Sequence, residues 1–420
     1  MSSTVQYNDM KDSGIKWIGT VPSAWDISRI GSLYSLRNEK VSDKDFPPLS
    51  VTMKGIVPQL ATAAKTNDGD NRKLVRVGDF VINSRSDRRG SCGISPLDGS
   101  VSLINTVLTP LGEMNPGYYN WLFHTSMFAD EFYQWGHGIV DDLWTTRWQE
   151  MKQILVPVPP LEVQSEIAIY LDDLCGRIDS VIEDVTITVE KYKSWKASLI
   201  YETVTRGLRK KATYRDTNVE WIGDAPRHWN IRRLHQLVRQ VKNKNSEMQE
   251  KNLLSLSYGK IKRKDIKSRD GLLPASFDGY NIIEKGDIVL RLTDLQNDHT
   301  SLRVGLSKER GIITSAYVTI RPINSKHSNY LYYILHSFDL KKGFYGMGSG
   351  VRQGLNFDEV KELLLVIPPE REQEDICAYL DDKCSQIDSL ITEKESLITD
   401  LLSYRKSLIY ETVMGRRKVV

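Results

Sequence analysis

The segments "VPPLEVQSEIAIYLDD" (residues 158–173) and "SLIYETV" (198–204) decide the fold, because both return later in the chain. The first recurs as "IPPEREQEDICAYLDD" at 367–382, and the second recurs letter for letter at 407–413. Both pairs are separated by 209 positions. A long segment spelled twice at one spacing indicates an internal duplication.

Two shorter segments extend the repeat toward the beginning of each copy. "WIGTVPSAW" (17–25) returns as "WIGDAPRHW" (221–229), and "VGDFVI" (77–82) is echoed by "KGDIVL" (285–290). Their offsets are 204 and 208, so small insertions separate the copies. Each half is therefore expected to hold a globular segment of about 150 residues followed by one long helix.

The helix prediction rests on apolar residues that alternate spacings of four and three, as in a heptad seam. In the first copy these are Ile167, Leu171, Leu174, Ile178, Val181, Val185, Thr188, Tyr192, Trp195 and Leu199. In the second copy they are Ile376, Leu380, Lys383, Ile387, Leu390, Lys394, Leu397, Leu401, Tyr404 and Leu408. Each helix should follow a Pro-Pro step and run about 40 residues, roughly 60 Å. Two equal stripes favour helices packed on one another over single helices in larger cores.

The globular segments are expected to be mixed α and β, so the fold class is α+β. Short β-branched runs bounded by Gly, Asp and Pro predict strands, and the aromatic-rich stretches at 115–133 and 327–345 predict one helix each. The predicted domains are 1–155 and 211–365, and the predicted helix regions are 156–210 and 366–420.

Composition excludes several classes of protein. The chain has 420 residues, 40% hydrophobic and 26% charged, and no apolar run approaches the roughly 20 residues of a membrane helix. Its first residues resemble no secretory signal, so a cytoplasmic protein is expected. The four cysteines are too scattered for a disulfide framework, and no metal-ligand spacing is present among Cys or His.

Charge is divided by region. Residues 162–206 contain nine acids and five bases, and residues 370–413 contain eleven acids and five bases, so the two helices are acidic while the rest of the chain is basic. Residues 225–246 hold six bases and no acid, and "KIKRKDIKSR" (260–269) holds six bases against one acid. In the first copy the denser patch is "RSDRR" (85–89), with Arg37 and Lys54 upstream. Basic patches in both halves favour nucleic acid as a partner over merely solvated loops.

Within these patches, certain side chains are candidates for contacts with phosphates or base edges, because Arg, Lys, Asn and Gln make such contacts. The predicted DNA-binding residues are Lys54, Gln59, Asn83, Arg85, Arg88, Arg89, Lys260, Lys262, Arg263, Lys264 and Arg291, and Gln296 and Asn297 are further candidates for base edges.

Catalytic motifs for DNA chemistry are largely missing from the sequence. No GxxxxGK[ST] phosphate loop and no [DN]PP[YF] tetrapeptide occurs. "FYGMG" (344–348) has the form of a methyl-donor loop, but it follows an aromatic helix and the first copy has "WGHG" (135–138) in a similar place. A stand-alone S-adenosylmethionine-dependent DNA adenine methyltransferase using this loop is the alternative hypothesis. A coiled-coil assembly protein without nucleic acid is a third.

These residues resemble a known family, the specificity (S) subunits of type I restriction-modification systems. "YNDMKDSGIKWIGTVPSAW" (7–25) is similar to the opening of such a subunit, and residues 348–382 resemble the passage from a target-recognition domain into a conserved helix. The likeness covers nearly the whole chain twice, and it is weakest inside the two globular segments.

The resemblance implies a non-catalytic subunit with two target-recognition domains, each gripping half of a split double-stranded DNA site. The two helices would pack as an antiparallel coiled coil, serve as a spacer and dock methyltransferase (M) subunits. S-adenosylmethionine for adenine modification would belong to the M subunits, and ATP and Mg for cleavage to restriction (R) subunits. No cofactor and no membrane would be bound by this chain. Lys383 and Lys394 depart from an apolar seam.

Such a duplication fits an asymmetric two-part site, which requires two different readers at a fixed distance. A repeated unit of domain plus helix folds into a pseudo-twofold object that can hold them.

Overall fold

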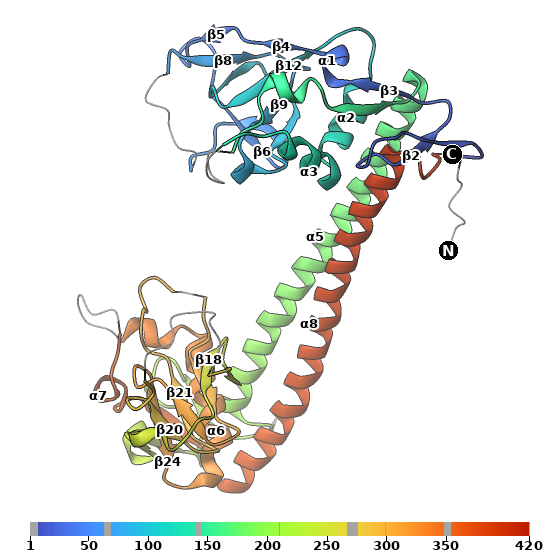
Figure 1. The fold of residues 1–420 in the computed structure, drawn as a ribbon. Coiled ribbons are helices and arrows are strands. Elements are labelled where there is room, and N and C mark those ends of the chain that lie inside the picture. The colour runs from blue at the N-terminus through green and yellow to red at the C-terminus, as the bar shows by residue number, and fades with distance from the viewer. Residues whose placement is uncertain are drawn as a thin grey trace. The chain divides into compact units, whose positions relative to one another are not determined.

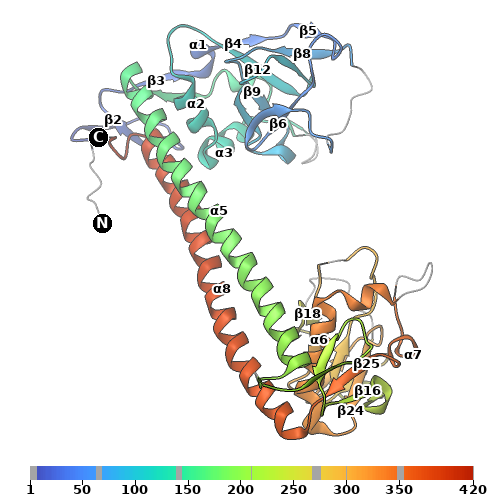
Figure 2. The ribbon, with the colours of Figure 1, turned by 180° about the vertical axis from the view of Figure 1, so that it is seen from behind.

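The computed structural model describes residues 7–62, 69–138, 144–209, 211–266, 276–298, 300–347 and 354–419. The chain divides into two compact units, Met1–Thr186 with Ser396–Val420, and Ile187–Glu395. Two long helices, α5 (Leu161–Arg206) and α8 (Glu370–Val413), lie side by side in both views (Figures 1 and 2). Each helix begins in one unit and ends in the other.

The first unit is built on antiparallel sheets. Its four-stranded sheet has the order β10-β9-β12-β4, a three-stranded sheet has the order β11-β8-β5, and β6-β7, β1-β2 and β13-β3 are two-stranded. The strands are β1 (Met10–Asp12), β2 (Thr20–Pro22), β3 (Asp26–Arg29), β4 (Tyr34–Arg37), β5 (Lys40–Val41), β6 (Leu49–Thr52), β7 (Gly55–Pro58), β8 (Arg72–Val75), β9 (Phe80–Asn83), β10 (Cys92–Ile94), β11 (Gly99–Val101), β12 (Asn105–Pro110) and β13 (Leu155–Val158). Its short helices are α1 (Ile30–Leu33), α2 (Pro116–Phe123), α3 (Ser126–Gln134) and α4 (Trp148–Met151).

The second unit repeats this plan. Its four-stranded sheet has the order β17-β24-β21-β22, and β20-β23, β18-β19, β14-β15 and β16-β25 are two-stranded. The strands are β14 (Tyr214–Asp216), β15 (Asp224–Pro226), β16 (Asn230–Arg233), β17 (Val238–Gln240), β18 (Leu254–Ser257), β19 (Lys260–Arg263), β20 (Asn281–Ile283), β21 (Ile288–Leu290), β22 (Val304–Leu306), β23 (Gly311–Ile313), β24 (Val318–Pro322) and β25 (Leu364–Ile367). Its short helices are α6 (Ser328–Leu340) and α7 (Phe357–Val360).

The strand orders of the two large sheets correspond one to one, so the mixed α and β fold class and the internal repeat are confirmed. One local prediction was too simple: the aromatic stretch of the first copy forms two helices, α2 and α3, where one was expected. The break occurs because the Thr125 side chain accepts a hydrogen bond from the backbone N–H of Phe128 and so starts a new helix. The second copy keeps one helix, α6.

The long helices have 46 and 44 residues and begin directly after their Pro-Pro steps. A glutamine in the first turn of each helix is buried and fixes the connection to the preceding strand. Gln164 donates to the carbonyl of Pro159 at 2.8 Å, and Gln373 donates to the carbonyl of Pro368 at the same distance. The two copies therefore enter their helices in the same way.

Within each unit the start of one long helix packs against the end of the other, so the pair is antiparallel. In the first unit, Asp179 of α5 pairs with Arg405 of α8 at 2.9 Å. In the second unit, Lys196 of α5 pairs with Asp388 of α8 at 2.6 Å. The expected antiparallel coiled coil is confirmed.

Both copies of "SLIYETV" end a helix inside a globular core. The hydroxyl of Tyr330 donates to the carbonyl of Val204 in the second unit, and the hydroxyl of Tyr118 donates to that of Val413 in the first, each at 2.9 Å. Val204 and Val413 are fully buried, and burying a side chain of this size contributes about 1.5–3 kcal/mol.

A glycine follows each of these helix ends. Gly207 and Gly415 have φ of 74° and 66°, the left-handed conformation of a helix C-terminus. A Cβ at either position would lie 2.9 Å from a tryptophan ring, that of Trp229 or Trp25. The segment "SLIYETV" therefore occurs twice because each copy ends a long helix and completes a hydrophobic core with the same contacts.

The middle of the helix pair is less buried than the heptad pattern predicted. Of the expected seam residues, Val181, Trp195, Leu390, Leu397 and Tyr404 are exposed, whereas Val189, which is not on the expected seam, is buried. The helix ends pack against both a partner helix and a globular domain, but the middle contacts only the partner helix. Burial therefore concentrates at the ends.

Candidate nucleic-acid interface

In each unit, a loop and a hairpin stand next to each other at the edge of the large sheet. In the first unit the loop 84–91 joins β9 to β10, and the hairpin is β6-β7. In the second unit the loop 291–303 joins β21 to β22, and the hairpin is β18-β19. The sequence-predicted residues of both halves fall on these elements or at their ends.

Close packing over glycine brings each hairpin against the strand that follows the loop. A Cβ at Gly93 of β10 would lie 2.9 Å from the Cα of Gly55 in β7. A Cβ at Gly305 of β22 would lie 3.0 Å from the Cγ1 of Ile261 in β19. Glycine is required at both sites because the hairpin backbone or side chains occupy the space of a side chain.

The first-unit hairpin presents two of the predicted residues. Lys54 is exposed at the turn, where its backbone N–H donates to the hydroxyl of Thr52 at 3.1 Å. Gln59 follows β7 and is half-buried, and its backbone N–H donates to the carbonyl of Pro48 at 3.1 Å. Lys54 is thus accessible to a phosphate, while Gln59 lies nearer the base of the hairpin.

The first-unit loop carries three arginines. Arg85 and Arg88 lie within 4 Å of Asp87, and their side chains are 37% and 68% exposed. Arg89 pairs with Asp130, and its guanidinium stands 5.4 Å from the centre of the Tyr133 ring. A hollow of about 440 Å³ opens here, lined by Ser86, Arg89, Asp130, Tyr133, Gln134 and Trp144.

Asn83 and Tyr133 support this loop from below. The side-chain oxygen of Asn83 accepts a hydrogen bond from the backbone N–H of Arg85 at 3.1 Å. The hydroxyl of Tyr133 donates to the carbonyl of Asn83 at 3.3 Å and lies 3.4 Å from the carbonyl of Arg88. Asn83 therefore shapes the start of the loop, in addition to its predicted role at a base edge.

The second-unit loop is organised by a buried arginine that the sequence analysis did not single out. Arg303 is fully buried, and its Nε donates to the hydroxyl of Tyr345 at 2.9 Å. Its two terminal nitrogens donate to four backbone carbonyls, those of Arg291, Thr293, Asp294 and Asp298. All five N–H groups of a guanidinium are used in this way. The sequence offered one signal for this role: Arg303 is a positively charged residue directly before a strand of apolar residues.

The predicted residues of this loop lie at its start and apex. Arg291 pairs with Asp298 at 3.4 Å, and Gln296 and Asn297 are exposed. Hydrogen bonds from the hydroxyl and backbone N–H of Ser301 hold the pKa of Asp298 well below its usual range, and Arg291 adds to this effect. The exposed amides therefore sit on a loop whose backbone is fixed from inside.

The second-unit hairpin carries the basic residues of "KIKR". Lys260, Lys262 and Lys264 alternate along the strand and are exposed. Arg263 points the other way and pairs with Glu309, whose pKa is lowered by the hydrogen bond from that guanidinium. The three lysines are thus better placed for phosphates than Arg263. Lys267 and Arg269 of the predicted patch lie outside the described residues.

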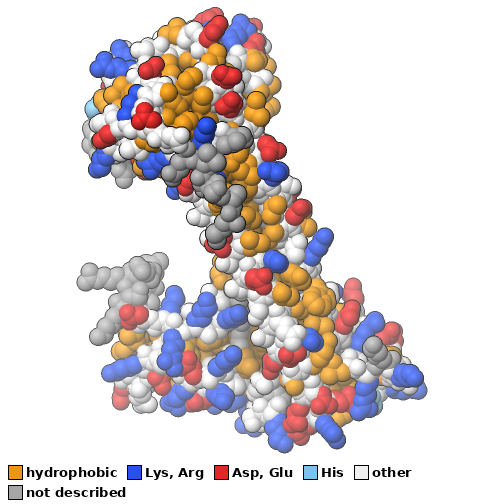
Figure 3. Space-filling model, turned by 90° about the vertical axis from the view of Figure 1, so that its right-hand side faces the viewer, with side chains coloured by type: hydrophobic (Ala, Val, Ile, Leu, Met, Phe, Trp, Pro, Cys, Tyr) orange, Lys and Arg blue, Asp and Glu red, His pale blue; other side chains and the backbone are white. Residues whose placement is uncertain are grey.

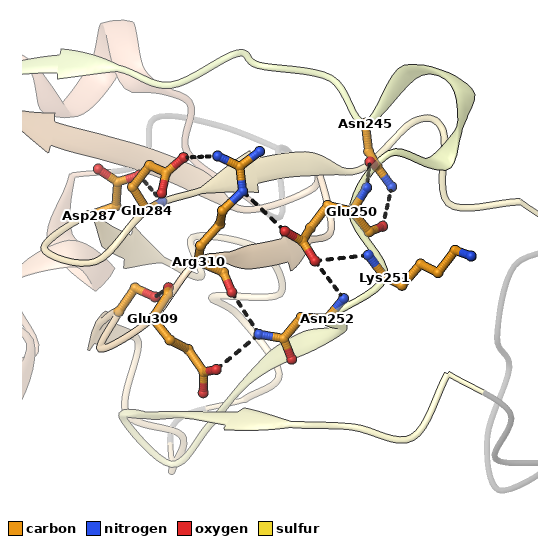
Figure 4. Close-up of polar contacts among 9 residues, drawn as sticks. Asn245, Glu250, Lys251, Asn252, Glu284, Asp287, Glu309 and Arg310 are labelled. Atoms are coloured by element: carbon orange, nitrogen blue, oxygen red, sulfur yellow. Dashed lines mark hydrogen bonds and ion pairs between the residues drawn. The ribbon is translucent and has the colours of Figure 1, made fainter.

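An ion-pair network fastens the segment that leads into this hairpin (Figure 4). Arg310 pairs with Glu250 at 3.1 Å and with Glu284 at 2.7 Å. The side chain of Asn252 donates to Glu309 at 3.0 Å and to the carbonyl of Arg310. Hydrogen bonds at 2.8 and 2.9 Å link Asn245 to the backbone of Glu250. The hairpin is therefore attached to the sheet by charge pairs as well as by apolar packing.

Arg37, a basic residue upstream of the first-unit patch, pairs with an acid inside the protein. Arg37 donates to Asp79 at 2.7 and 3.1 Å, and Asp79 is buried. Asp287, at the corresponding place in the second copy, is likewise buried and pairs with Arg321 at 2.7 Å. The "VGD" and "KGD" turns are thus matched structural sites that use up a basic side chain.

The methyl-donor alternative receives no support from the described residues. Phe344 is fully buried, and the hydroxyl of Tyr345 donates to the carbonyl of Asp298 at 3.0 Å. These residues pack the core and brace the loop 291–303. Gly348 lies outside the described residues.

The described residues show neither a metal cluster nor a membrane-spanning helix. No group of three His, Cys, Asp or Glu side chains suited to a metal ion occurs among them. Within the same part of the chain, no helix is long and apolar enough to cross a membrane. The four cysteines are buried thiols.

Comparison with known sequences identifies one domain family. Residues 226–399 match the family described as the type I restriction modification DNA specificity domain. The MjaVIII specificity subunit of a type I restriction enzyme from Methanocaldococcus jannaschii is 23% identical over 229 residues. That match covers 52% of this chain and 50% of the relative, so it spans about half of the relative's length.

Solved structures share the fold over nearly the whole chain. A chain from a study of complex assembly and conformational transition of the type I R-M system has a TM-score of 0.68 and 14% identity, covering 94% of this chain and 98% of that one. The HsdS subunit from Thermoanaerobacter tengcongensis has a TM-score of 0.51 and 16% identity, covering 96% and 99%.

Proposed function

We propose that the chain is a specificity subunit of a type I restriction-modification system, because residues 226–399 match the DNA specificity domain of these systems. In this proposal it reads a bipartite DNA site, with one target-recognition domain on each half. The observation that carries this proposal is the duplication of the interface itself. Each unit places a loop and a hairpin with at least one exposed lysine at the corresponding edge of its large sheet, while the other residues on them differ. Two different readers on one repeated scaffold suit two different half-sites.

The proposed contacts divide by chemistry. Lys54, Lys260, Lys262 and Lys264 are exposed cations at hairpins and would bind phosphates. Arg85, Arg88, Gln296 and Asn297 are exposed or partly exposed on the loops and are suited to base edges. Arg89, Arg263 and Arg291 rank second because each pairs with an acid from another part of its unit or across its loop. Arg85 and Arg88 share Asp87, which is their neighbour on the same loop.

The regions 156–210 and 366–420 serve in this proposal as the spacer, and 1–155 and 211–365 as the readers. The helices also carry exposed hydrophobic side chains that one partner helix does not cover (Figure 3). These include Ile169, Val181, Ile187, Trp195, Leu390, Leu397, Leu402 and Tyr404. Apolar side chains exposed along a helix pair fit a protein partner, and we assign them to methyltransferase subunits.

The chain is a non-catalytic subunit in this proposal. Methyltransferase subunits would bring S-adenosylmethionine for adenine methylation, and restriction subunits would bring ATP and Mg for translocation and cleavage, all in the cytoplasm. Labelled methyl donor mixed with DNA and the purified chain alone should give no transfer. Transfer by the chain without partners would contradict the proposal.

Footprinting tests the bipartite site directly. The chain assembled with its methyltransferase subunits should protect two short blocks separated by unspecified base pairs, and methylated adenines in the host genome should show the same split sequence. One continuous block would refute the proposal.

The spacer role has its own experiment. Four residues inserted before Ser198 add about one turn, roughly 6 Å, to α5, with a matching insertion before Ser407 in α8. The preferred gap between the two blocks should change. An unchanged gap in a folded variant would refute the spacer role.

A further inference from the structure

The turn of each reader hairpin exposes a large apolar side chain. Met53 is 71% exposed at the turn of β6-β7, and Tyr258 is 75% exposed at the turn of β18-β19. Both values exceed that of any other large hydrophobic residue among the described residues. Methionine is among the residues most often buried and tyrosine is intermediate, so the two highest exposures at matching places call for an explanation.

The two residues occupy the same position in the two copies. In β6-β7, Thr52 pairs with Gly55 across the turn, and in β18-β19, Ser257 pairs with Lys260. Met53 and Tyr258 are thus each the first residue of a two-residue turn. The domains have diverged strongly, yet both keep a bulky apolar group at this point, although one is aliphatic and the other aromatic.

Neither turn is loosely attached. Below the turns, Leu49 and Ile56 belong to a buried cluster of the first unit, and Leu254 and Leu256 belong to the matching cluster of the second. A Cβ at Gly259 would lie 3.1 Å from the Cβ of Leu302, which directly precedes Arg303. In the second unit the turn therefore rests against the end of the loop 291–303.

Tyr258 is held in an unfavourable backbone conformation. Its φ is 47° and that of Gly259 is 73°, as in a type I′ turn, where Asn-Gly is the preferred pair. Positive φ is uncommon for a bulky residue and costs of the order of 1–3 kcal/mol. A strained and exposed tyrosine in place of asparagine contributes little to folding, which points to a contact outside the chain.

The surrounding charge identifies the partner. Lys54 follows Met53, and the exposed lysines 260, 262 and 264 extend from the turn of Tyr258 along β19. An apolar tip next to one lysine in the first unit and three in the second matches duplex DNA, whose phosphates line its grooves and whose bases form an apolar stack. Resting on the function proposed above, we propose that Met53 and Tyr258 enter a groove of the DNA and make apolar contact with bases, one in each half-site.

The test uses Tyr258→Asn, because asparagine suits the left-handed turn and removes the aromatic ring. The chain is assembled with its methyltransferase subunits and bound to a duplex carrying the footprinted site. Affinity should fall about 5- to 100-fold, as expected when one base–aromatic interaction is removed. Met53→Ala should cost about 5-fold, as expected for a smaller apolar group. The slope of log affinity against log salt should stay unchanged in both, since every phosphate keeps its cation.

Matched controls are Val77→Ala and Ile323→Ala, which truncate exposed apolar residues at other places in the same units. They should bind the duplex like the unaltered chain, and Tyr258→Phe should retain most of the affinity. Binding by Tyr258→Asn within twofold of the unaltered chain would overturn the inference, as would normal DNA binding with defective subunit assembly. Failure of the unaltered complex to bind any split site would instead overturn the proposed function.

Discussion

The loop of the first unit and the loop of the second unit are each held in place by a side chain from their own unit, but the two side chains are of different kinds. Loop 84–91 is held by the hydroxyl of Tyr133, at 3.3 and 3.4 Å from two backbone carbonyls. Loop 291–303 is held by the buried guanidinium of Arg303, which donates to four backbone carbonyls. The sheet beneath both loops has the same strand order. The scaffold has been kept while the support of each reader has changed with its loop.

Loop length accounts for the difference. The first loop has eight residues between β9 and β10, and the second has thirteen between β21 and β22. A longer loop folds back over itself and places more of its backbone carbonyls in the protein interior. Each of these carbonyls then requires a hydrogen-bond donor. A single guanidinium with five N–H groups meets that need better than any other side chain.

Replacing Arg303 should have the largest effect. Arg303→Met fills a similar space but leaves four partly buried carbonyls without their donor, so the free energy of unfolding of the second unit should fall by about 3–5 kcal/mol. Urea titration gives the size of the decrease, and hydrogen exchange should place it in loop 291–303. Binding to the half-site of the second unit should weaken as well.

Arg303→Lys separates charge from geometry. An ammonium group has three donors and cannot reach carbonyls on both sides in one plane, so most of the destabilisation should remain. Full stability in Arg303→Lys would mean that charge alone supports the loop and that the five-bond geometry is not needed.

A second contrast concerns two buried groups of opposite pH dependence on α6. Burial raises the pKa of Asp339 to about 6, and burial lowers the pKa of His336 to about 4. The protonated form of Asp339 is favoured by folding, so its contribution is present at low pH and is lost as pH rises through 6. The neutral form of His336 is favoured, so its contribution is present above about 6.5 and is lost as pH falls toward 4.

The two contributions oppose each other between pH 4 and 6.5, and each amounts to about 3 kcal/mol. Asp339→Asn should leave the histidine unopposed, so stability relative to the unaltered chain should fall as pH decreases. His336→Gln should show the reverse slope. Unfolding free energies measured by urea at half-unit pH steps test this, and parallel curves for both variants would contradict it.

The sequence was sufficient to predict the duplicated long helices, but it did not reveal the buried arginine that supports only one of the two loops. Two copies of "SLIYETV" and two Pro-Pro steps were sufficient to predict the long helices, because a duplication constrains both halves at once. The candidate cations were found from charge density, which is a local property. Arg303 was missed because its role depends on carbonyls up to twelve residues earlier in the chain and on Tyr345, which only folding brings together.

The heptad pattern overstated burial for a similar reason. Spacing shows which helix face is apolar, but the partner that covers it must be supplied by the fold. Trp195 and Tyr404 fall on the predicted seam and are exposed, while Ile200 near the end of α5 is buried by the globular core. Periodicity therefore predicts a helix more reliably than it predicts what the helix packs against.

The basic hairpin of the second unit offers a smaller test within one strand. Lys260, Lys262 and Lys264 changed together to Ala should weaken DNA binding and reduce its salt slope by up to about 0.9 for each phosphate that is no longer neutralised. Arg263→Ala should change the slope less, because Arg263 is engaged by Glu309. Equal slopes for the triple variant and the unaltered chain would exclude these lysines from the interface.

Removal of the Tyr133 hydroxyl should have the smallest effect. Tyr133→Phe keeps the ring beneath Arg89 and removes only two long hydrogen bonds, so the first unit should be destabilised by about 0.5–1.5 kcal/mol. Urea titration measures this, and hydrogen exchange in loop 84–91 should quicken without change in loop 291–303. A destabilisation as large as that of Arg303→Met would mean that a short loop depends on its support as strongly as a long one. Loop length would then no longer explain why only the second unit buries an arginine here.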